Sequence, residues 1–387
     1  MIQVTSKYNC CGCSACVQVC PKQCIEFNED SHGFRYPSVN LEACIDCGLC
    51  EKVCPVINQS ESHKPLEVFA AKSLSDDIRM NSSSGGIFTL IAEYIIENGG
   101  VVFGAMFDNK WEVRHSYADT REGLKVFQGS KYVQSIIGDS FLIAKSFLDQ
   151  GRLVFFTGTP CQISGLNRFL RKDYKNLITA DVVCHGVPSP LIWRSYVNYI
   201  REQNLGYEIT KISFRNKEKG WRKFSMQIIG QCASIPCDSK VILQETTDKN
   251  LYMQMFLNDL SLRPSCSSCP SKSGKSCSDI TLADFWGIEN GSPEIYDNKG
   301  VSLVMLNNEK GTALFNKLQV NKVKSSYDLA LKYNPCIEYS VKENEYVPLF
   351  WEKFRIGGLA LASTVLKYFR LSVVDRILRR IMKILKS

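Results

Sequence analysis

Residues 10–21 read CCGCSACVQVCP, and residues 44–55 read CIDCGLCEKVCP. Both stretches contain cysteines in the spacing C-x2-C-x2-C-x3-C, followed at once by proline. Three closely spaced thiolates can bind three irons of one cubane cluster, and the fourth cysteine, displaced past a short helix, reaches toward the other cluster. The repeated spacing therefore predicts two 4Fe-4S clusters in the first 58 residues.

The crossed arrangement of the two runs assigns four ligands to each cluster. The first cluster takes Cys10, Cys13, Cys16 and Cys54, and the second takes Cys44, Cys47, Cys50 and Cys20. Cys11 competes with Cys10 as a ligand, but the register that ends in Cys20 and Pro21 favours Cys10. Cys24 is explained more simply as a small buried apolar residue. A zinc ribbon is the alternative, although a zinc site needs neither the third cysteine nor the proline of each run.

The first 58 residues resemble a bacterial-type two-cluster ferredoxin. Because so small a module has little hydrophobic core, we expect its clusters to hold it together. Clusters move one electron at a time and offer no pocket for a substrate. The site that exchanges electrons with this module is therefore expected in residues 66–350.

The remaining composition narrows the class of protein. The chain has 387 residues, of which 44% are hydrophobic and 18 are cysteines. The opening residues show no basic region followed by an apolar run, so we expect no secretory signal and a cytoplasmic protein with reduced cysteines. No stretch of 18 consecutive apolar residues occurs in the sequence, so we expect no membrane-spanning helix.

The net charge of +8 is concentrated at the end of the chain. Residues 359–387 hold seven lysines and arginines against one acid, Asp375, while the rest of the chain is nearly neutral. Because a general positive field is missing, we expect no nucleic-acid partner. Apolar residues recur in this tail at helical spacing. They predict a basic amphipathic helix that either contacts the inner face of an anionic membrane or docks on protein.

Hydrophobic patterning divides the chain into four segments and indicates an α+β protein. The ferredoxin-like domain at 1–58 is followed by a polar linker at 59–65, a mixed α/β domain at 66–350 and the helical tail at 359–387. The mixed domain has parts of about 66–150 and 151–350. Strands are expected at 66–71, 101–107, 153–158, 177–183, 208–216, 223–230, 278–286 and 301–307. Helices are expected at 86–100, 164–170 and 189–204, and the candidates for capping the first are Ser82–Ser84.

Three polar stretches rich in glycine lie at the ends of these elements, namely NSSSGG at 81–86, QGSKYVQS at 128–135 and FTGTPCQISG at 156–165. The first precedes a helix, where backbone N–H groups can cradle a phosphate, although a helix cap with a tight turn is the plainer interpretation. The third lies between a strand and a helix, where ligands bind in α/β sheets. None contains G-x-G-x-x-G, so the sequence does not support a Rossmann-type NAD site.

Behind a two-cluster ferredoxin, these stretches resemble the family of coenzyme F420 hydrogenase/dehydrogenase beta subunits, which are relatives of the flavin- and iron-sulfur-dependent hydroxymethyl-chlorophyll reductases. The matching residues follow in family order at 83–86, 129–132, 157–162, 184–190, 214–217, 220–221, 266, 269, 278–281 and 284–287. The nearest branch resembles bacterial proteins of polysaccharide loci, which usually have glycine where this chain has Ala283.

The resemblance implies FAD bound by the mixed α/β domain, exchanging hydride with a substrate and single electrons with the clusters. The implied cofactor-binding residues are Ser83, Ser84, Gly85, Gly86, Gly129, Ser130, Lys131, Tyr132, Thr157, Gly158, Thr159, Pro160 and Gln162. The candidate catalytic residues are Lys131 and His185. Lys131 is expected near the pyrophosphate or the reduced flavin, with a surface lysine as the alternative. His185 is expected to donate a proton, with a structural histidine in a tight turn as the alternative.

Four further cysteines lie inside the family motifs, namely Cys161, Cys184, Cys266 and Cys269. Because four thiolates bind one 4Fe-4S cluster, we hypothesise that they form a third cluster beside the flavin. Cys277 is the competing ligand, and a zinc site or ordinary core cysteines are the alternatives. The cysteines interpreted as structural are Cys232, Cys237 and Cys336.

A turn between two expected strands carries Arg215, Lys217, Trp221 and Arg222, which either bind an anionic substrate tail or form a solvated hairpin end. We expect an iron-sulfur flavoenzyme that passes electrons between a ferredoxin or another redox protein, its clusters and FAD, and then to or from an organic substrate. The family implies coenzyme F420 as that substrate, and the bacterial branch favours a cell-envelope glycan or lipid-linked intermediate. The alternative is an electron-transfer module that serves a partner enzyme and has no substrate site.

Overall fold

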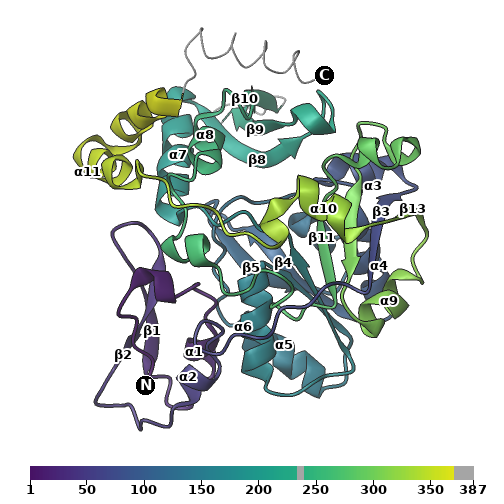
Figure 1. Cartoon of the computed structure of the whole chain (residues 1–387). Helices are drawn as coiled ribbons and strands as arrows, with labels where there is room; N and C mark the ends of the chain where they lie inside the picture. The colour runs from purple at the N-terminus through teal and green to yellow at the C-terminus, as the bar shows by residue number, and fades with distance from the viewer. Residues whose placement is uncertain (233–238, 370–387) are drawn as a thin grey trace.

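The computed structural model describes residues 1–232 and 239–369. Figure 1 shows a small N-terminal module, a central sheet with helices around it, and a smaller sheet accompanied by three helices. The predicted tail at 359–387 lies outside the described residues from residue 370 onward. Within the described ranges, no helix has the length and apolar character needed to cross a membrane.

The central sheet contains eight strands in the order β13-β3-β12-β11-β7-β6-β4-β5. Their bounds are β3 Glu67–Ser73, β4 Val101–Phe107, β5 Val113–Ala118, β6 Val154–Gly158, β7 Leu177–Val182, β11 Ile280–Asp284, β12 Ser302–Leu306 and β13 Val320–Ser325. The pairs β4–β6, β6–β7 and β7–β11 are parallel, and the other pairs are antiparallel. The parallel middle of the sheet is rich in apolar residues because both of its faces are covered.

Side chains of β6 alternate between two hydrophobic clusters on opposite faces of the sheet. Phe155 packs in a cluster with α4 (Ile87–Glu97) and α9 (Glu309–Phe315). Val154 and Phe156 pack in a cluster with α5 (Ser140–Asp149) and α6 (Pro160–Leu170). At the other end of the sheet, α10 (Tyr327–Tyr333) packs against β3 and β12, and α3 (Asp76–Asn81) follows β3.

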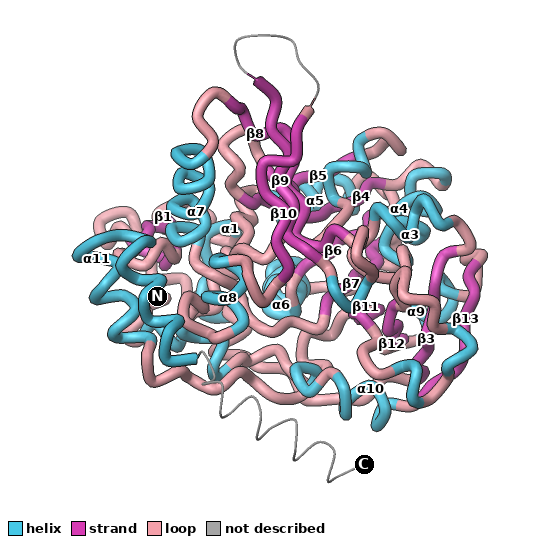
Figure 2. The backbone as a smooth tube through the Cα atoms, turned by 90° about the horizontal axis from the view of Figure 1, so that it is seen from above, coloured by secondary structure: helices cyan, strands magenta, loops and turns pink. Residues whose placement is uncertain are grey.

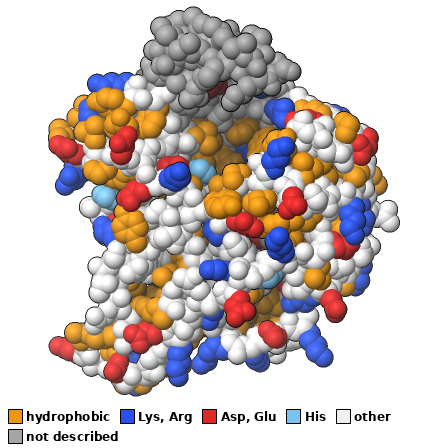
Figure 3. All heavy atoms as spheres, in the orientation of Figure 1, with side chains coloured by type: hydrophobic (Ala, Val, Ile, Leu, Met, Phe, Trp, Pro, Cys, Tyr) orange, Lys and Arg blue, Asp and Glu red, His pale blue; other side chains and the backbone are white. Residues whose placement is uncertain are grey.

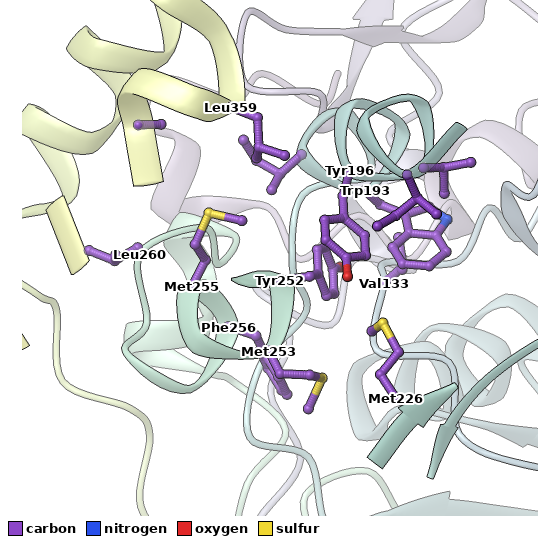
Figure 4. Packing of buried hydrophobic residues seen from close by; sticks show 14 of the residues in the cluster. Val133, Trp193, Tyr196, Met226, Tyr252, Met253, Met255, Phe256, Leu260 and Leu359 are labelled. Carbon is purple, nitrogen blue, oxygen red and sulfur yellow. The ribbon is translucent and has the colours of Figure 1, made fainter. Parts of the chain in front are cut away.

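The smaller sheet is antiparallel, in the order β10-β9-β8. Its strands are β8 Tyr207–Asn216, β9 Ser225–Cys232 and β10 Lys240–Thr246, and its helices are α7 Pro190–Gln203, α8 Leu251–Leu257 and α11 Val347–Ser363. Figure 2 shows the three helices gathered to one side of these strands. In Figure 4, Trp193 and Tyr196 from α7 meet Tyr252 from α8, and the ring centroids of Trp193 and Tyr252 are 5.0 Å apart. This aromatic cluster forms the core of the smaller sheet and its helices, and it reaches the edge of the central sheet through Val113 of β5.

The N-terminal module contains β1 Ile25–Glu29, β2 Arg35–Val39, α1 Ala15–Gln18 and α2 Leu49–Lys52. It does not stand apart, because Cys11, Cys13 and Ala15 are buried in the same cluster as α5 and α6. A Cβ atom at Gly165 of α6 would lie 2.8 Å from the Cβ of Cys13. The module therefore packs directly on α6, at a position where only glycine leaves enough room.

Short 3-10 helices lie in the connections. They are η1 Lys7–Asn9, η2 Gly123–Phe127, η3 Trp221–Lys223, η4 Pro264–Ser268, η5 Ile288–Asn290, η6 Pro293–Ile295, η7 Pro335–Ile337 and η8 Thr364–Phe369. The predicted linker at 59–65 follows the surface of the main body, since the His63 N–H donates a hydrogen bond to the Ser273 carbonyl at 3.1 Å.

The strands and helices predicted before residue 359 all form, with ends that differ by a few residues. The α+β architecture with a ferredoxin-type module is therefore confirmed. The prediction that one of Ser82–Ser84 caps α4 is wrong. Gly86 occupies the cap position with a φ of 87°, and no side chain caps this helix. The serine hydroxyls bond instead to groups elsewhere in the chain, as the next subsection describes.

We expect Gly165→Val to lower the free energy of unfolding by about 1–3 kcal/mol, because the new side chain would force Cys13 away from α6. Urea denaturation under anaerobic conditions measures this change. Ser146→Val is the control, since it adds the same side chain at an exposed position of α5. Equal destabilisation by the two substitutions would contradict the close packing of the module on α6.

Candidate functional site

A cavity of about 640 Å³ lies between the two sheets, above the carboxyl ends of β6, β7 and β11. This volume is within the range of pockets that bind small molecules and cofactors. All of the predicted cofactor residues line it except Gly85 and Pro160. The structure therefore brings the three polar, glycine-rich stretches to one place.

The serine-rich stretch at 82–84 forms the entrance to α4. The Ser82 hydroxyl donates to the Ile78 carbonyl at 2.7 Å, and the Ser84 hydroxyl donates to the Val301 carbonyl at 2.9 Å. Gly85 touches the sheet, since a Cβ there would lie 2.4 Å from the Ala71 carbonyl oxygen. The serines thus hold the loop in place and leave the first turn of α4 without a side-chain cap.

The first turn of α4 lines the cavity with Ile87, Phe88 and Thr89. Thr89 is 3% exposed, and its hydroxyl has no hydrogen-bond partner within the described structure. A helix N-terminus carries a partial positive charge and favours anions. The uncapped turn and the unpartnered hydroxyl together indicate that a polar ligand belongs at this end of the cavity.

The stretch at 129–132 forms the adjoining wall. The Ser130 N–H donates to the Ser83 hydroxyl at 2.8 Å, which ties this wall to the serine loop. The Lys131 ammonium donates to the carbonyls of Val126 and Gln128 at 2.9 and 3.0 Å. Burial lowers the pKa of Lys131 to about 7, because no carboxylate within the described structure pairs with it. Lys131 is therefore a cavity lysine, whose charge an anionic ligand would stabilise.

The stretch at 157–162 forms a third wall of the cavity, and a polar network lies behind it. The Thr157 carbonyl lies 3.0 Å from Nε2 of His115, and the Ser135 hydroxyl lies 2.9 Å from its Nδ1. Gln162 connects to this network by donating to the Ser135 hydroxyl at 2.9 Å. Burial lowers the pKa of His115 to about 4, so this imidazole is neutral near neutral pH. The network orients β6 and the start of α6 without adding charge to the cavity.

His185 lines the cavity but is already paired. Its Nε2 lies 2.6 Å from a carboxylate oxygen of Asp259, and its Nδ1 lies 3.7 Å from the Cys336 sulfur. Burial alone would lower the pKa of His185, but the hydrogen bonds to Asp259 and Cys336 outweigh it and raise the pKa to about 9. The side chain is therefore an imidazolium held by Asp259, and Cys336 has a polar contact that the sequence did not indicate.

Two of the three predicted hairpin cations, Arg215 and Lys217, are buried, whereas Arg222 is exposed and pairs with Glu289. Figure 3 shows positive and negative side chains interspersed on one face of the molecule. The charges that act on the cavity are therefore those of buried side chains. Arg215 donates to both oxygens of Asp284 at 2.7 and 3.1 Å and to the Tyr132 hydroxyl at 3.1 Å. Lys217 donates to the carbonyls of Ser84 and Lys299. These cations hold the cavity wall together, and neither is a solvated hairpin end.

The four cysteines of the hypothetical third cluster lie close to one another. Burial and the neighbouring Cys266 raise the pKa of the Cys184 thiol, with smaller effects from Cys161 and Cys269. Burial likewise raises the pKa of Cys266 to about 12 and that of Cys269 to about 11. Buried thiols this close together ionise only when a bound cation compensates them.

Cys277, the competing ligand, lies apart from this group. Its side chain is exposed, and its thiol contacts the Lys275 carbonyl at 3.8 Å. The group also approaches the N-terminal module, because a hydrogen bond to Cys11 is the main cause of the raised pKa of Cys161. Cys11 was expected only as a competing ligand. In the structure it is a buried thiol of the module that hydrogen-bonds to Cys161.

The module brings the predicted ligands of each cluster together. Burial and the nearby thiols of Cys10, Cys54 and Cys50 raise the pKa of Cys16. A small cavity is lined by the second set, Cys20, Cys44, Cys47 and Cys50. Cys24 is buried as expected, but its sulfur also lies 3.4 Å from that of Cys20.

Within the described residues, no three cysteine, histidine or carboxylate side chains surround a point that a single metal ion would occupy. A zinc ion holds its sulfur ligands at about 2.3 Å, which requires tight convergence on one point. A cubane of four irons draws its thiolates from a wider shell.

Two residues near the cavity were missed from the sequence. Asp181 lies at the carboxyl end of β7 and lines both the large cavity and a smaller one of about 30 Å³. Its Oδ1 has no hydrogen-bond partner within the described structure. Burial raises the pKa of Asp181, while hydrogen bonds from nearby hydroxyl groups, including that of Ser276, lower it. Its place at the carboxyl end of a predicted strand was an available signal. Asp259 offered no such signal, since only the fold brings it to His185.

Comparison with known proteins matches most of the chain to the two models of one family and to a 4Fe-4S domain. Residues 68–139 match the N-terminal model of the coenzyme F420 hydrogenase/dehydrogenase beta subunit, and residues 151–328 match its C-terminal model. Residues 9–58 match the 4Fe-4S dicluster domain. The predicted iron-sulfur module is thereby confirmed.

Curated relatives resemble the chain over different lengths. The coenzyme F420-dependent sulfite reductase of Methanocaldococcus jannaschii is 24% identical over 88% of this chain and 52% of its own length. A component of the F(420)H(2) dehydrogenase of Methanosarcina mazei is 25% identical over 54% of this chain and 60% of its own length. The 7Fe ferredoxin of Hydrogenibacillus schlegelii is 46% identical over 11% of this chain and 49% of its own length. The chain spans about half the length of the curated relatives it matches.

Among solved structures, a chain of the F420-reducing [NiFe] hydrogenase complex from Methanosarcina barkeri is 18% identical. The match covers 76% of this chain and 94% of that one, with a TM-score of 0.46.

We expect Asp284→Asn to lower the free energy of unfolding by about 3–5 kcal/mol, because it leaves the buried guanidinium of Arg215 uncompensated. Urea denaturation measures the loss. Glu97→Gln is the control, since it breaks the exposed pair of Glu97 with Arg121 and should cost no more than about 1 kcal/mol. Equal costs would show that Arg215 does not depend on Asp284.

Proposed function

This chain belongs to the family of coenzyme F420 hydrogenase/dehydrogenase beta subunits, and on that premise we propose that it is an iron-sulfur flavoprotein oxidoreductase. It passes electrons between ferredoxin-type 4Fe-4S clusters, FAD and an organic hydride donor or acceptor. The observation that carries the proposal is the cavity whose wall includes both the three glycine-rich stretches and Cys184 of the cysteine quartet.

The residues present fit FAD. The uncapped first turn of α4, the unpartnered Thr89 hydroxyl and Lys131 form a polar end of the cavity suited to a pyrophosphate. Phe224, Met253 and Phe256 supply an apolar surface on the opposite side, suited to a flat ring system. Bound FAD would supply the exchange between hydride transfer and single-electron transfer.

The protein's own residues tune this cavity in three ways. Lys131 offers a positive charge that an anionic ligand stabilises, while His115 stays neutral. Burial raises the pKa of Asp181, which lines the cavity and whose Oδ1 has no hydrogen-bond partner within the described structure. His185 is committed to Asp259, so we assign it the role of a fixed cation beside the cavity.

A route for electrons leads from the cavity to the surface of the module. Cys184 lines the cavity and belongs to the quartet proposed for a third cluster. Cys161 of the same quartet reaches Cys11, which hydrogen-bonds to Cys13 of the first cluster. Cys47 of the second cluster is exposed. The donor or acceptor at this end is a ferredoxin or another redox protein that docks on the module.

The organic substrate is coenzyme F420 or, for the polysaccharide-locus branch, a cell-envelope intermediate. The related proteins whose names include coenzyme F420 support the first choice. Within the predicted tail, Leu359, Ala362, Val365 and Leu366 are buried in the core of the smaller sheet and its helices. The basic sequence from residue 370 onward supports contact with an anionic membrane surface, where a lipid-linked intermediate would be found. An electron-transfer module that serves a partner enzyme would lack turnover of its own.

The proposal is tested by purifying the full chain anaerobically and quantifying iron, sulfide and bound flavin. We expect FAD to bind, and the reduced protein to turn over coenzyme F420 or another soluble hydride acceptor. Binding of FAD without turnover of any acceptor would favour the electron-transfer module. A chain with its clusters intact but no affinity for FAD would overturn the proposal.

The affinity for FAD is expected to fall as the pH rises above about 7. Free Lys131 has a pKa of about 7, and only its charged form attracts the pyrophosphate. Above that pH, binding must take up a proton, which weakens affinity by up to about tenfold per pH unit. Fluorescence titrations at pH 6.5 and 8.5 measure the change. Lys131→Met should bind more weakly at pH 6.5 and show no such dependence.

We expect Cys161→Ser to lose about four irons per chain relative to wild type, because one 4Fe-4S cluster no longer forms. Cys277→Ser is the matched control, since this exposed cysteine lies apart from the quartet. Iron and sulfide analysis after anaerobic reconstitution gives the result. An unchanged iron content in Cys161→Ser would exclude Cys161 as a cluster ligand.

A further inference from the structure

Arg263 connects the N-terminal module to the main body from a fully enclosed position. It is 1% exposed. Its Nε donates to the Cys10 carbonyl at 2.7 Å, and its Nη2 donates to the Arg35 carbonyl at 3.0 Å. Its Nη1 donates to Gln134 of the main body at 3.0 Å. The guanidinium thus lies at the contact between the module and the main body. Arg263 directly precedes the loop that holds Cys266 and Cys269.

The charge of Arg263 has no carboxylate partner. Among residues 1–232 and 239–369, the ion pairs of the other deeply buried arginines are Arg79 with Asp297 and Arg215 with Asp284, and none involves Arg263. Its side chain instead lies over the Tyr36 ring, 4.3 Å from the centroid. A buried cation costs several kcal/mol unless an anion compensates it. The structure therefore calls for an anion that is not a carboxylate.

The guanidinium also contacts a cysteine sulfur of the module. Its Nη2 donates to the Cys10 sulfur at 3.5 Å. The Cys266 N–H donates to the Arg263 carbonyl at 2.9 Å, and the positive charge of Arg263 also reaches the thiols of Cys161 and Cys266. One cation thus faces a predicted ligand of the first cluster and two of the quartet.

Tyr36 supplies a second hydrogen-bond donor in the same place. Its hydroxyl is buried and has no hydrogen-bond partner within the described structure. Burial raises the pKa of Tyr36 against the lowering effect of Arg263, and the nearby thiols of Cys10 and Cys266 add smaller effects. An enclosed O–H group without an acceptor, next to cluster ligands, is placed to donate to sulfur.

We propose that Arg263 is the shared counter-cation of the first cluster and the third, and that it raises the reduction potentials of both, with the Tyr36 hydroxyl assisting. Reduction adds one electron from the redox partner to a cluster and breaks no bond, so the added negative charge stays beside the guanidinium. Net charge and hydrogen bonds to sulfur are what set cluster potentials. Arg263 therefore makes the two inner clusters easier to reduce and draws electrons toward the cavity.

For the third cluster the inference rests on the proposed function, whereas for the first it rests on the dicluster domain alone. The test is a potentiometric titration of the full, reconstituted chain, followed by electron paramagnetic resonance. In Arg263→Gln, we expect the one-electron reduction of the inner clusters to become at least tenfold less favourable. A tenfold change corresponds to about 59 mV for one electron.

Two further variants separate charge from architecture. Arg263→Lys keeps the charge and should shift the potentials less than Arg263→Gln does. Tyr36→Phe keeps the ring and should shift them in the same direction as Arg263→Gln. The matched control is Arg35→Gln, which removes an exposed arginine from the same strand as Tyr36 and should change the equilibrium by less than about twofold, because water and salt screen its charge.

Unchanged potentials in Arg263→Gln with a full iron content would overturn the proposal. If that variant loses its clusters, unchanged potentials in Tyr36→Phe, with a full iron content, overturn it instead. A wild-type chain that binds only two clusters would refute the third cluster of the proposed function. In that case the potential of the first cluster, with Cys10 as its ligand, still decides the role of Arg263.

Discussion

The contact between the N-terminal module and α6 is the constraint on which the proposed electron route depends. Gly165 lets Cys13 approach the helix, and this approach brings Cys11 to Cys161. Electron transfer between clusters requires that they lie close together, and two separately folded domains on a free linker would not ensure that. Sharing one hydrophobic cluster between module and body makes the distance a property of the fold.

The cavity follows from the topology of the central sheet. Strands β6, β7 and β11 are parallel neighbours, so their carboxyl ends and the loops that follow meet at one edge. The smaller sheet and α8 face this edge and complete the walls of the cavity. The buried ion pair of Arg215 and Asp284 joins the smaller sheet to β11 and stabilises this closure. The same arrangement removes Lys131 and Asp181 from water and shifts their pKa values in opposite directions.

Local patterns predicted the elements well and the side-chain partners poorly. The helix at 87–97 was expected from its apolar spacing, but its cap was assigned to the serines, since the sequence did not show that Ser83 and Ser84 have distant partners. Arg215 and Lys217 were expected in a turn because the strands on either side were recognised. Their burial depends on β11 and the segment near residue 299, which are distant in the sequence. The linker was recognised by its polarity, but its course along the surface was not.

The sequence alone determined the two ferredoxin clusters, because their ligands lie within runs of a few residues and the spacing reflects the geometry of a cubane. It also indicated three stretches that line the cavity, since each combines glycine and polar residues at the end of a predicted element. Only the tertiary structure decided that Cys161, Cys184, Cys266 and Cys269 lie together, and that Arg263 is enclosed beside the Cys10 sulfur without a carboxylate. These relations join residues that are far apart in the chain, and no local spacing encodes a distance that packing alone creates.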